Sequence, residues 1–430
     1  MNNRIPALAG LVAVLVTVAL PSGVTTATTT HTNVVIDWNR TMLSTFFAAN
    51  VPPPAANRLG AIVQSSVFDA VNGIDRAYTA IHVQPAAPPD ASAKAAAANA
   101  AYTTLLALFP AQKPALDGAL ATSLRRMQDD EGDSGSISQG LAWGKTVADQ
   151  IVAWRAADGF SAPAPPYVFG TAPGQWQPTP GGSGAPKFRQ LATTTPFALT
   201  SPSQFTLAGP PALDSARYAA AFNEVKALGG QASSVRTSDQ TQTAKFWQLD
   251  TPVAMWDRVA DSLALEHHLN VLKSARLLAL VNVSIADSLI AVFYAKNVFN
   301  TWRPATAIAD ADLDGNPDTS PDSTWLPVLV TPYFQEYPSA HSGVSSAAAS
   351  ILASTFGETS EFTVTSDGLP GMTRSFTSFA DAVGQVADAR VWAGFHYRFS
   401  CNDATQLGGE VAAYVEAALM RRVRNDGEGK

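Results

Sequence analysis

The sequence RLLALVNVSIADSLIAVFYAK, residues 276–296, is almost entirely apolar between its two terminal cations. A helix of this length could cross a lipid bilayer. Asn282 and Asp287 interrupt the apolar run, however, and a carboxylate at the middle of a bilayer costs free energy. We therefore expect a helix buried at the centre of a helical bundle, whose C-terminal end delivers Lys296 into the interior.

Helical patterns also dominate the rest of the chain, whereas the alternation typical of strands is scarce. We predict an all-α fold, a multi-helix bundle with long Pro/Gly-rich loops. The loop at residues 159–211 is long enough to suggest a role, such as an active-site wall. The expected helices cover residues 57–72, 92–109, 113–127, 136–156, 215–228, 256–278, 281–299, 342–356, 375–391 and 403–422.

The composition is that of a globular protein. The chain has 430 residues, of which 46% are hydrophobic, and this excludes collagen-like and disordered classes. A net charge of −7 gives no reason to expect nucleic acid or an anionic membrane surface as a partner. Any anion must therefore be bound locally, by a few cations in one pocket.

The N-terminus has the pattern of an export signal. A basic residue, an apolar run at residues 7–20 and small residues before position 28 follow one another. We expect residues 1–27 to be a signal peptide and the protein to be secreted, with no membrane span in the mature chain. Residues 28–430 would form a single domain, with an N-terminal helical layer at 28–255 and a catalytic core at 256–425.

Three short segments of the C-terminal half carry chemistry. In the first, KNVFNTWRP, Lys296 and Arg303 are seven residues apart, which places both on one face of a helix that Pro304 would end. Two cations would then point the same way. The segment taken alone favours a solvated helix end.

The second segment is Pro338-Ser339-Ala340-His341, followed by an Ala/Ser-rich helix. Ser339 is a candidate N-cap, and the free N–H groups of a first helical turn bind anions. Taken alone, this segment predicts only the start of a helix.

The third segment contains Arg390 and His396, with Gly394 between them to let the chain turn. The three segments together supply three cations, a hydroxyl, backbone amides and two histidines. This set of groups suits a tetrahedral or trigonal-bipyramidal oxyanion.

The ordered triplet Lys-x6-Arg-Pro, Pro-Ser-x-His and Arg-x5-His resembles the signature of the superfamily of vanadium-dependent haloperoxidases and type 2 phosphatidic acid phosphatases. The resemblance spans residues 296–396 with every spacing kept, and export and a helical fold are similar to its secreted bacterial haloperoxidase-like branch. It implies a vanadate cofactor, with phosphate competing for the same site, and hydrogen peroxide, a halide and a small organic acceptor as partners.

The resemblance also implies residue roles. Lys296, Arg303 and Arg390 would neutralise the oxygens of the anion, while Ser339 and the amide of Ala340 would donate hydrogen bonds. The remaining two roles fall to the histidines: His396 would be the vanadium ligand, or the nucleophile of a phosphatase, and His341 the acid/base. A hydrogen bond to the second ring nitrogen of His396 would keep the imidazole neutral and fix its orientation.

Several positions depart from the family pattern. Ala340 stands where Gly is usual, and Ala389 where Ser is usual. Phosphatases of the family carry an Asp four residues after the last histidine, where this chain has Ser400, and the nearest downstream acid is Asp403. A nucleophilic imidazole gains from a carboxylate partner, so this departure favours the haloperoxidase over the phosphatase.

Two phenylalanines are candidates for the halide pocket. Phe334 resembles the chloroperoxidase pattern, whereas Phe293 stands where that type carries Trp. The halide therefore stays open between the members of the family.

An acidic stretch between the first two segments has the spacing of a calcium loop. Its sixth position is Gly315, but the twelfth is Pro321, where a calcium loop has a bidentate Glu. Calcium and a solvated Asp-rich turn are both open. The candidate ligands are Asp310, Asp312, Asp314 and Asp318.

Three functions follow from these residues. The first is a vanadate-dependent haloperoxidase, which would oxidise a halide with hydrogen peroxide to hypohalous acid. The second is a secreted acid phosphatase that uses the same site. The third is an inactive anion- or calcium-binding homologue, for which Ala340, Ala389 and Ser400 would be the signs.

Overall fold

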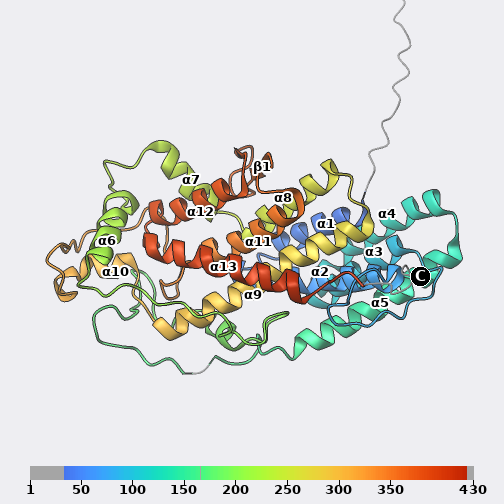
Figure 1. The fold of residues 1–430 in the computed structure, drawn as a ribbon, viewed down its shortest axis with the longest axis horizontal. Helices are drawn as coiled ribbons and strands as arrows, with labels where there is room; N and C mark the ends of the chain where they lie inside the picture. The colour runs from blue at the N-terminus through green and yellow to red at the C-terminus, as the bar shows by residue number, and fades with distance from the viewer. Residues whose placement is uncertain (1–32, 165, 424–430) are drawn as a thin grey trace, which may run out of the picture. The chain divides into compact units, whose positions relative to one another are not determined.

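The computed structural model describes residues 33–164 and 166–423, and the expected signal peptide at residues 1–27 lies outside them. The predicted all-α class is confirmed, because thirteen α-helices account for most of the described chain (Figure 1). The helices are α1 (Val34–Ala48), α2 (Pro53–Asp75), α3 (Ala93–Leu108), α4 (Lys113–Glu131), α5 (Ser134–Ala156), α6 (Ala216–Gly229), α7 (Ser238–Gln248), α8 (Pro252–Glu266), α9 (Val271–Phe299), α10 (Pro304–Ala309), α11 (Ala340–Phe356), α12 (Phe379–Trp392) and α13 (Arg398–Ala418).

Helix α9 is the central element, as predicted. It packs against α2, α11 and α13, so its side chains from Leu277 to Phe293 are buried. In the described part of the chain it is the helix long and apolar enough to cross a membrane, and 94% of its most apolar window is buried inside the fold. The side chain of Asn270 caps its N-terminus, and Asn300 ends it in the left-handed conformation (φ 48°).

Several predicted helix boundaries are wrong: the break expected between 278 and 281 is absent, and α13 begins at Arg398 rather than at 403. Two further errors have local backbone reasons. The helix expected at 256–278 is divided into α8 and α9, because His268 adopts a left-handed conformation (φ 50°) and Asn270 starts a new helix. The helix expected at 375–391 begins only at Phe379, after the N-cap Ser378. Helices α1, α7 and α10 were not expected from the sequence.

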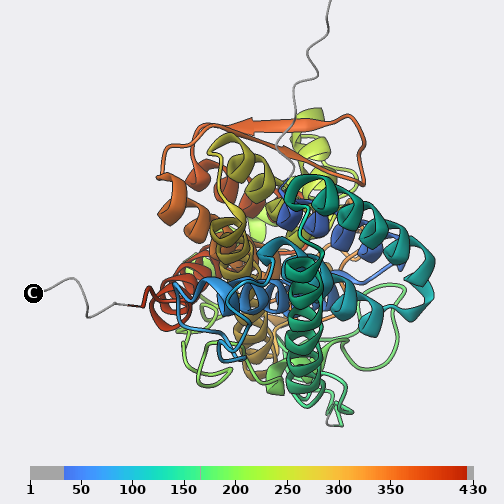
Figure 2. The same ribbon diagram turned by 90° about the vertical axis from the view of Figure 1, so that its right-hand side faces the viewer.

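The residues just before α12 form a small sheet instead. Strands β1 (Phe362–Thr365) and β2 (Thr373–Phe376) pair antiparallel, with Phe362 opposite Phe376. This hairpin packs against α8, and Figure 2 shows it lying across one side of the helices. Its inward residues Phe362, Val364 and Phe376 belong to the hydrophobic core.

The long loop at 159–211 is fixed to the second half of α9. The carboxylate of Asp287 accepts hydrogen bonds from the backbone amides of Phe197, Ala198 and Leu199 at 2.7, 2.7 and 2.9 Å. Further along the loop, the amide of Trp176 donates to the carbonyl of Asn300 at 2.7 Å. These contacts hold the loop beside the end of α9 that carries Lys296.

Candidate active site

The first predicted segment folds differently from the expectation. Lys296 lies in the last turn of α9, the chain leaves that helix at Asn300, and Arg303 is the N-cap of α10. Pro304 therefore begins a helix rather than ending one, as its fixed φ and missing N–H favour at a first helical position. Both cations nevertheless lie near the Phe334 ring, with Lys296 Nζ 5.3 Å and Arg303 Cζ 5.0 Å from its centroid.

The ammonium of Lys296 fixes the turn that precedes α11. Its Nζ donates to the carbonyl oxygens of Gln335, Glu336 and Pro338 at 2.8, 2.8 and 2.6 Å. An ammonium has three hydrogens, so these three bonds use all of them. Lys296 thus contributes positive charge to the site while its N–H groups hold the backbone.

Arg303 connects the same turn to the third segment. Its Nε donates to the carbonyl of Phe334 at 2.7 Å, and its Nη1 donates to the carbonyl of Phe395 at 3.0 Å. Nη1 also lies 3.1 Å from Nε2 of His396. Its Nη2 is buried and has no partner.

The tautomer of His396 follows from its two neighbours. Nδ1 lies 2.8 Å from Oε1 of Glu336, and Nε2 faces Arg303, which can only donate. Nε2 must therefore accept, and the ring proton sits on Nδ1, where it donates to the carboxylate. This arrangement directs the lone pair of Nε2 toward the cations, as a metal ligand or nucleophile requires.

The predicted partner for the second nitrogen of His396 is Glu336, a residue that was not identified from the sequence. Asp403, the nearest downstream acid, instead accepts a hydrogen bond from the hydroxyl of Tyr337 at 2.8 Å. Glu336 lies upstream in the sequence and reaches His396 only through the turn that Lys296 fixes. Its signal in the sequence is an acid two residues before Pro338, just outside the second segment.

Arg390 approaches from the last turn of α12. Its Nη1 donates to Oε1 of Gln248, at the end of α7, at 2.7 Å. Its Nε and Nη2 are buried without partners. Gly394 adopts φ 80°, so the chain reverses after α12 and brings His396 back beside the arginines, as predicted. Gln248 was not identified from the sequence.

The second segment forms the N-terminus of α11, as predicted. The hydroxyl oxygen of Ser339 accepts hydrogen bonds from the amide and hydroxyl of Ser342 at 3.5 and 3.0 Å. Within the described chain, the amides of Ala340 and His341 make no hydrogen bond. The ring nitrogen Nε2 of His341 is also buried and unpaired.

Burial sets the charge states of this cluster. Lys296, Arg303 and Arg390 are 0% exposed and His396 is 1% exposed. Burial lowers the pKa of Arg303 to about 10 and that of Arg390 to about 9, so both stay charged at neutral pH. Burial and the neighbouring arginine lower the pKa of Lys296, and its three carbonyl partners favour the charged form.

The two histidines are kept neutral by the same causes. Burial and the surrounding cations lower the pKa of His341 and of His396 well below the ordinary value. Burial raises the pKa of Glu336 to about 7, against the pull of Lys296 and Arg303. The centre therefore holds excess positive charge beside two neutral imidazoles.

The unpaired atoms define what this centre can bind. Buried polar atoms nearly always find a partner, yet Arg303 Nη2, Arg390 Nε and Nη2 and His341 Nε2 have none among the described residues. Each arginine atom is a donor on a cation, so an acceptor with negative charge satisfies them. The amides at the start of α11 add neutral donors. The donor set fits a small oxyanion such as vanadate or phosphate.

A cavity of about 440 Å³ opens beside this centre. His341 and Ala340 line it, as does Phe334. Phe293 is fully buried behind Phe334, with ring centroids 5.2 Å apart, and does not line the cavity. The loop at 159–211 contributes Lys187 and Phe188 to the wall.

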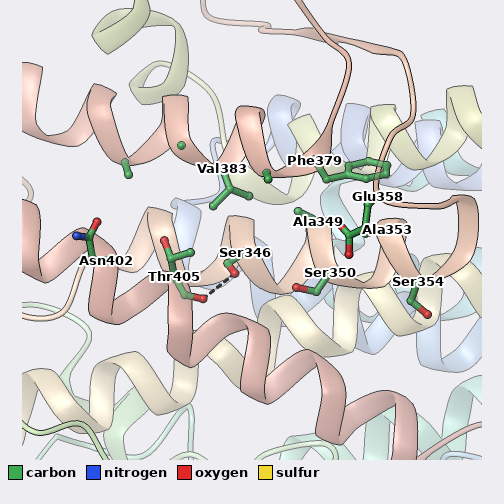
Figure 3. Close-up of a pocket in the computed structure, with 13 residues that line it drawn as sticks. Ser346, Ala349, Ser350, Ala353, Ser354, Glu358, Phe379, Val383, Asn402 and Thr405 are labelled. Atoms are coloured by element: carbon green, nitrogen blue, oxygen red, sulfur yellow. Dashed lines mark hydrogen bonds between the residues drawn. The ribbon is translucent and has the colours of Figure 1, made fainter.

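A second depression lies elsewhere, between α11, α12 and α13 (Figure 3). Small side chains such as Ser346, Ala349 and Ser350 line most of it, and Glu358 and Asn402 lie toward opposite ends. It contains none of the predicted site residues and no cation. The cavity beside His341 is therefore the one associated with the charged centre.

The calcium site is not supported by the structure. Asp314 turns inward and accepts hydrogen bonds from the amide of Asn316 and the hydroxyl of Thr319, both at 2.8 Å. The other three acids, Asp310, Asp312 and Asp318, point to solvent. In the described residues no three acidic, histidine or cysteine side chains gather as a metal site would require. The segment is an Asp/Asn turn closed by its own backbone.

Comparisons with known proteins cover the part of the chain that carries this centre. Residues 276–425 match the family model of the VCPO second helical-bundle domain, and this range includes the six polar side chains predicted for the site from the sequence. Vanadium chloroperoxidase from Curvularia inaequalis is 32% identical over 182 residues, which are 35% of this chain. The match spans only 29% of that relative's length.

Solved structures resemble the chain over most of its length. The crystal structure of the first bacterial vanadium-dependent iodoperoxidase has a TM-score of 0.72 and 26% identity, and covers 91% of this chain and 97% of its own. A holo-type bacterial vanadium-dependent chloroperoxidase shares the fold, with a TM-score of 0.68 and 17% identity. The match covers 85% of this chain and 91% of that chloroperoxidase. These matches support the superfamily of vanadium haloperoxidases and type 2 phosphatidic acid phosphatases, and residues 276–425 carry the match to its second helical-bundle domain.

Proposed function

We propose that the protein is a vanadate-dependent haloperoxidase that oxidises a halide with hydrogen peroxide. The observation that carries this proposal is the set of unpaired cationic donors on Arg303 and Arg390 around the neutral His396. The relatives, named as chloroperoxidases and an iodoperoxidase, give it further support. The net reaction is H₂O₂ + X⁻ + H⁺ → HOX + H₂O.

The residues of this chain would divide the work between binding and orientation. Arg303 and Arg390 neutralise the anion, and Ser339 with the first amides of α11 donates to it. His396 offers the lone pair of Nε2, and Glu336 keeps its proton on Nδ1. Vanadate, when bound, supplies an electrophilic centre that activates peroxide toward a halide ion.

His341 is the proposed acid/base. Its Nε2 is unpaired and its pKa is lowered by burial and by Arg390. An anion bound at the arginines would cancel part of that repulsion and raise the pKa of His341 toward neutrality. The group would then accept and return a proton at Nε2 near the pH of operation.

A phosphatase on the same site is the second candidate, and one observation favours it. The carboxylate of Glu336 lies 2.8 Å from Nδ1 of His396, so the imidazole has the partner that a nucleophile needs. The absence of an acid at Ser400 thus no longer argues against phosphoryl transfer, because an acid from another segment takes its place.

Two assays on one preparation test these candidates. The purified protein is loaded with orthovanadate and assayed for peroxide-dependent oxidation of iodide, bromide and chloride. The vanadate-free protein is assayed for hydrolysis of 4-nitrophenyl phosphate. Halide oxidation that requires vanadate and is inhibited by phosphate is expected. Hydrolysis without halide oxidation would instead select the phosphatase, and vanadate binding without either activity the inactive homologue.

Export is a separate part of the proposal. The expected signal at residues 1–27 predicts that the protein leaves the cell and begins near residue 28. N-terminal sequencing of protein recovered outside the cells of its native host tests this. A chain that keeps residue 1 inside the cell would contradict it.

A further inference from the structure

The cavity beside His341 is much larger than the small reactants need. Its volume is about 440 Å³, whereas a water-sized reactant occupies about 30 Å³. Volumes of several hundred cubic ångströms are those of sites for organic ligands. The cavity therefore has room for an organic molecule next to the proposed acid/base.

The walls of the cavity are mainly apolar and rigid. Three prolines precede or begin α2, and aromatic side chains line the wall beside them. Proline rings and aromatic faces favour a flat, unsaturated ligand over a flexible polar one. Representative wall residues are Pro53, Phe188, Leu289, Tyr333, Phe334 and Val344.

The loop at 159–211 supplies the polar end of the cavity. The amide of Lys187 donates to the carbonyl of Tyr333 at 2.9 Å, which fixes its backbone. Its exposed side chain makes no ion pair in the described chain and lines the cavity. The next residue, Phe188, adopts φ 60°, a conformation that bulky residues rarely take. The packing therefore holds a free cation and an aromatic ring together at this wall.

We propose that this cavity binds the organic acceptor of halogen transfer, and that the acceptor is an aromatic compound carrying a phenolate or carboxylate oxygen. The ring would lie between the proline and aromatic walls, and the oxygen would face Lys187. This inference rests on the proposed haloperoxidase function.

The chemistry of the transfer is electrophilic aromatic substitution. Hypohalous acid formed at the anion centre reacts as ArH + HOX → ArX + H₂O, in which a C–X bond forms and the O–X and C–H bonds break. The ring proton leaves with the hydroxide as water, and the halogen is reduced as the ring carbon is oxidised. A ring held beside His341 lies next to the centre where hypohalous acid forms, so it can react before the acid diffuses into bulk water.

The first test measures binding without turnover. Isothermal titration with 3-hydroxybenzoate is carried out on the protein with and without vanadate, with cyclohexanecarboxylate as the non-aromatic probe of equal charge. We expect 3-hydroxybenzoate to bind saturably and cyclohexanecarboxylate not to do so. The variant Lys187→Gln is expected to weaken 3-hydroxybenzoate binding about two- to fivefold, the effect of losing one solvent-exposed ion pair. Lys273→Gln, an exposed lysine at the start of α9, is the control and leaves it unchanged.

The second test uses the products. Turnover of 3-hydroxybenzoate is expected to saturate and to give a ratio of ring-halogenated isomers different from that of reagent hypohalite. Val330, at the cavity wall, is 89% exposed, so Val330→Trp narrows the entrance without disturbing the core. It should shift the isomer ratio toward that of the free reagent. Val235→Trp, at an exposed valine outside the cavity, should not.

The outcomes separate this inference from the proposed function. Peroxide-dependent formation of triiodide without any organic acceptor tests halide oxidation alone. If triiodide forms but 3-hydroxybenzoate neither binds nor gives a distinct isomer ratio, the acceptor site is refuted and the haloperoxidase stands. If the aromatic probe binds but no halide is oxidised, the haloperoxidase fails and so does halogen transfer in this cavity.

Discussion

Asp287 and Arg390 are both buried charges, and the difference between their surroundings separates structure from function. Asp287, in the middle of α9, is surrounded by three backbone amides of the long loop, which satisfy its carboxylate. Arg390, at the end of α12, has one partner and two unpaired N–H groups. In this pair, the charge with complete hydrogen bonding holds the fold together, whereas the incomplete one has donors left for a ligand.

The largest expected effect is a loss of folding stability, and it concerns Asp287, the buried charge whose hydrogen bonds are all made. Asp287→Ala leaves three backbone amides, two of them in buried contacts, without an acceptor, so the free energy of unfolding should fall by about 3–5 kcal/mol. Vanadate affinity should change little wherever the variant is folded. Urea unfolding measures the first quantity, and calorimetric titration the second.

Asp149→Ala is the matched control for this prediction. Asp149 forms an exposed ion pair with Lys145, four residues earlier, at 2.7 Å. Its loss should cost no more than about 0.5 kcal/mol. Equal losses of stability in both variants would show that the satisfied carboxylate does not anchor the loop.

At Arg390, the buried charge with unpaired N–H groups, we expect the opposite result: weaker vanadate binding without a loss of stability. Arg390→Met removes a cation from the centre, so vanadate binding should weaken by about 2–5 kcal/mol. The ligand-free protein should be as stable as the parent or more stable, because an apolar side chain replaces a partly unpaired buried charge. Arg125→Met, at an exposed arginine of α4, should alter neither quantity. A large loss of ligand-free stability in Arg390→Met would abolish the distinction between the two regions.

The third prediction concerns pH. The pKa of Glu336 is raised from its usual 4.5 to about 7, so the group is protonated below that pH. A protonated carboxyl no longer holds the proton of His396 on Nδ1 as a carboxylate does, and vanadate affinity should fall as the pH drops below 7. The raised pKa of Glu336 also means that the free energy of unfolding should fall as the pH rises from 4.5 to 7, because the carboxyl ionises more readily in the unfolded chain.

Two variants check the role of Glu336. Glu336→Gln keeps an acceptor for Nδ1 but cannot ionise. It should weaken vanadate binding about tenfold, and its vanadate affinity should lose the dependence on pH that Glu336 causes near neutral pH. Glu336→Ala should weaken it about a hundredfold. The ratio of wild-type to variant affinity cancels the pH dependence of vanadate itself. A ratio constant from pH 5.5 to 8 would show that Glu336 does not act through its charge.

The smallest expected effect is at Gln248, which holds one N–H of Arg390. Gln248→Ala should weaken vanadate binding by about 1 kcal/mol, because a single hydrogen bond is lost and Arg390 keeps its charge. Titration calorimetry at one pH measures it. An affinity equal to that of the parent would mean that packing alone orients Arg390.

The sequence was sufficient for the central helix and for the residues of the three segments. A buried helix such as α9 is readable because its apolar run is long and its polar interruptions are few. Lys296, Arg303, Arg390 and His396 were found through their spacing along the chain. Their roles as ligands of an anion stay predictions until binding is measured.

The partners of these residues could not be read in the same way. Glu336 and Gln248 reach the site from a turn and from the end of α7, at sequence distances that no local pattern encodes. The position of Pro304 was misjudged because proline both ends helices and begins them. The acidic loop around Asp314 has the spacing of a calcium site but uses its carboxylate to close the turn.

The most direct test of the account is a calorimetric titration of the purified protein and its Arg390→Met variant with orthovanadate. The account predicts one vanadate per chain for the parent, displacement by orthophosphate, and binding to the variant weaker by at least thirtyfold, which is about 2 kcal/mol. Equal binding to both proteins, or no binding to the parent, would contradict the assignment of the buried cations to an oxyanion.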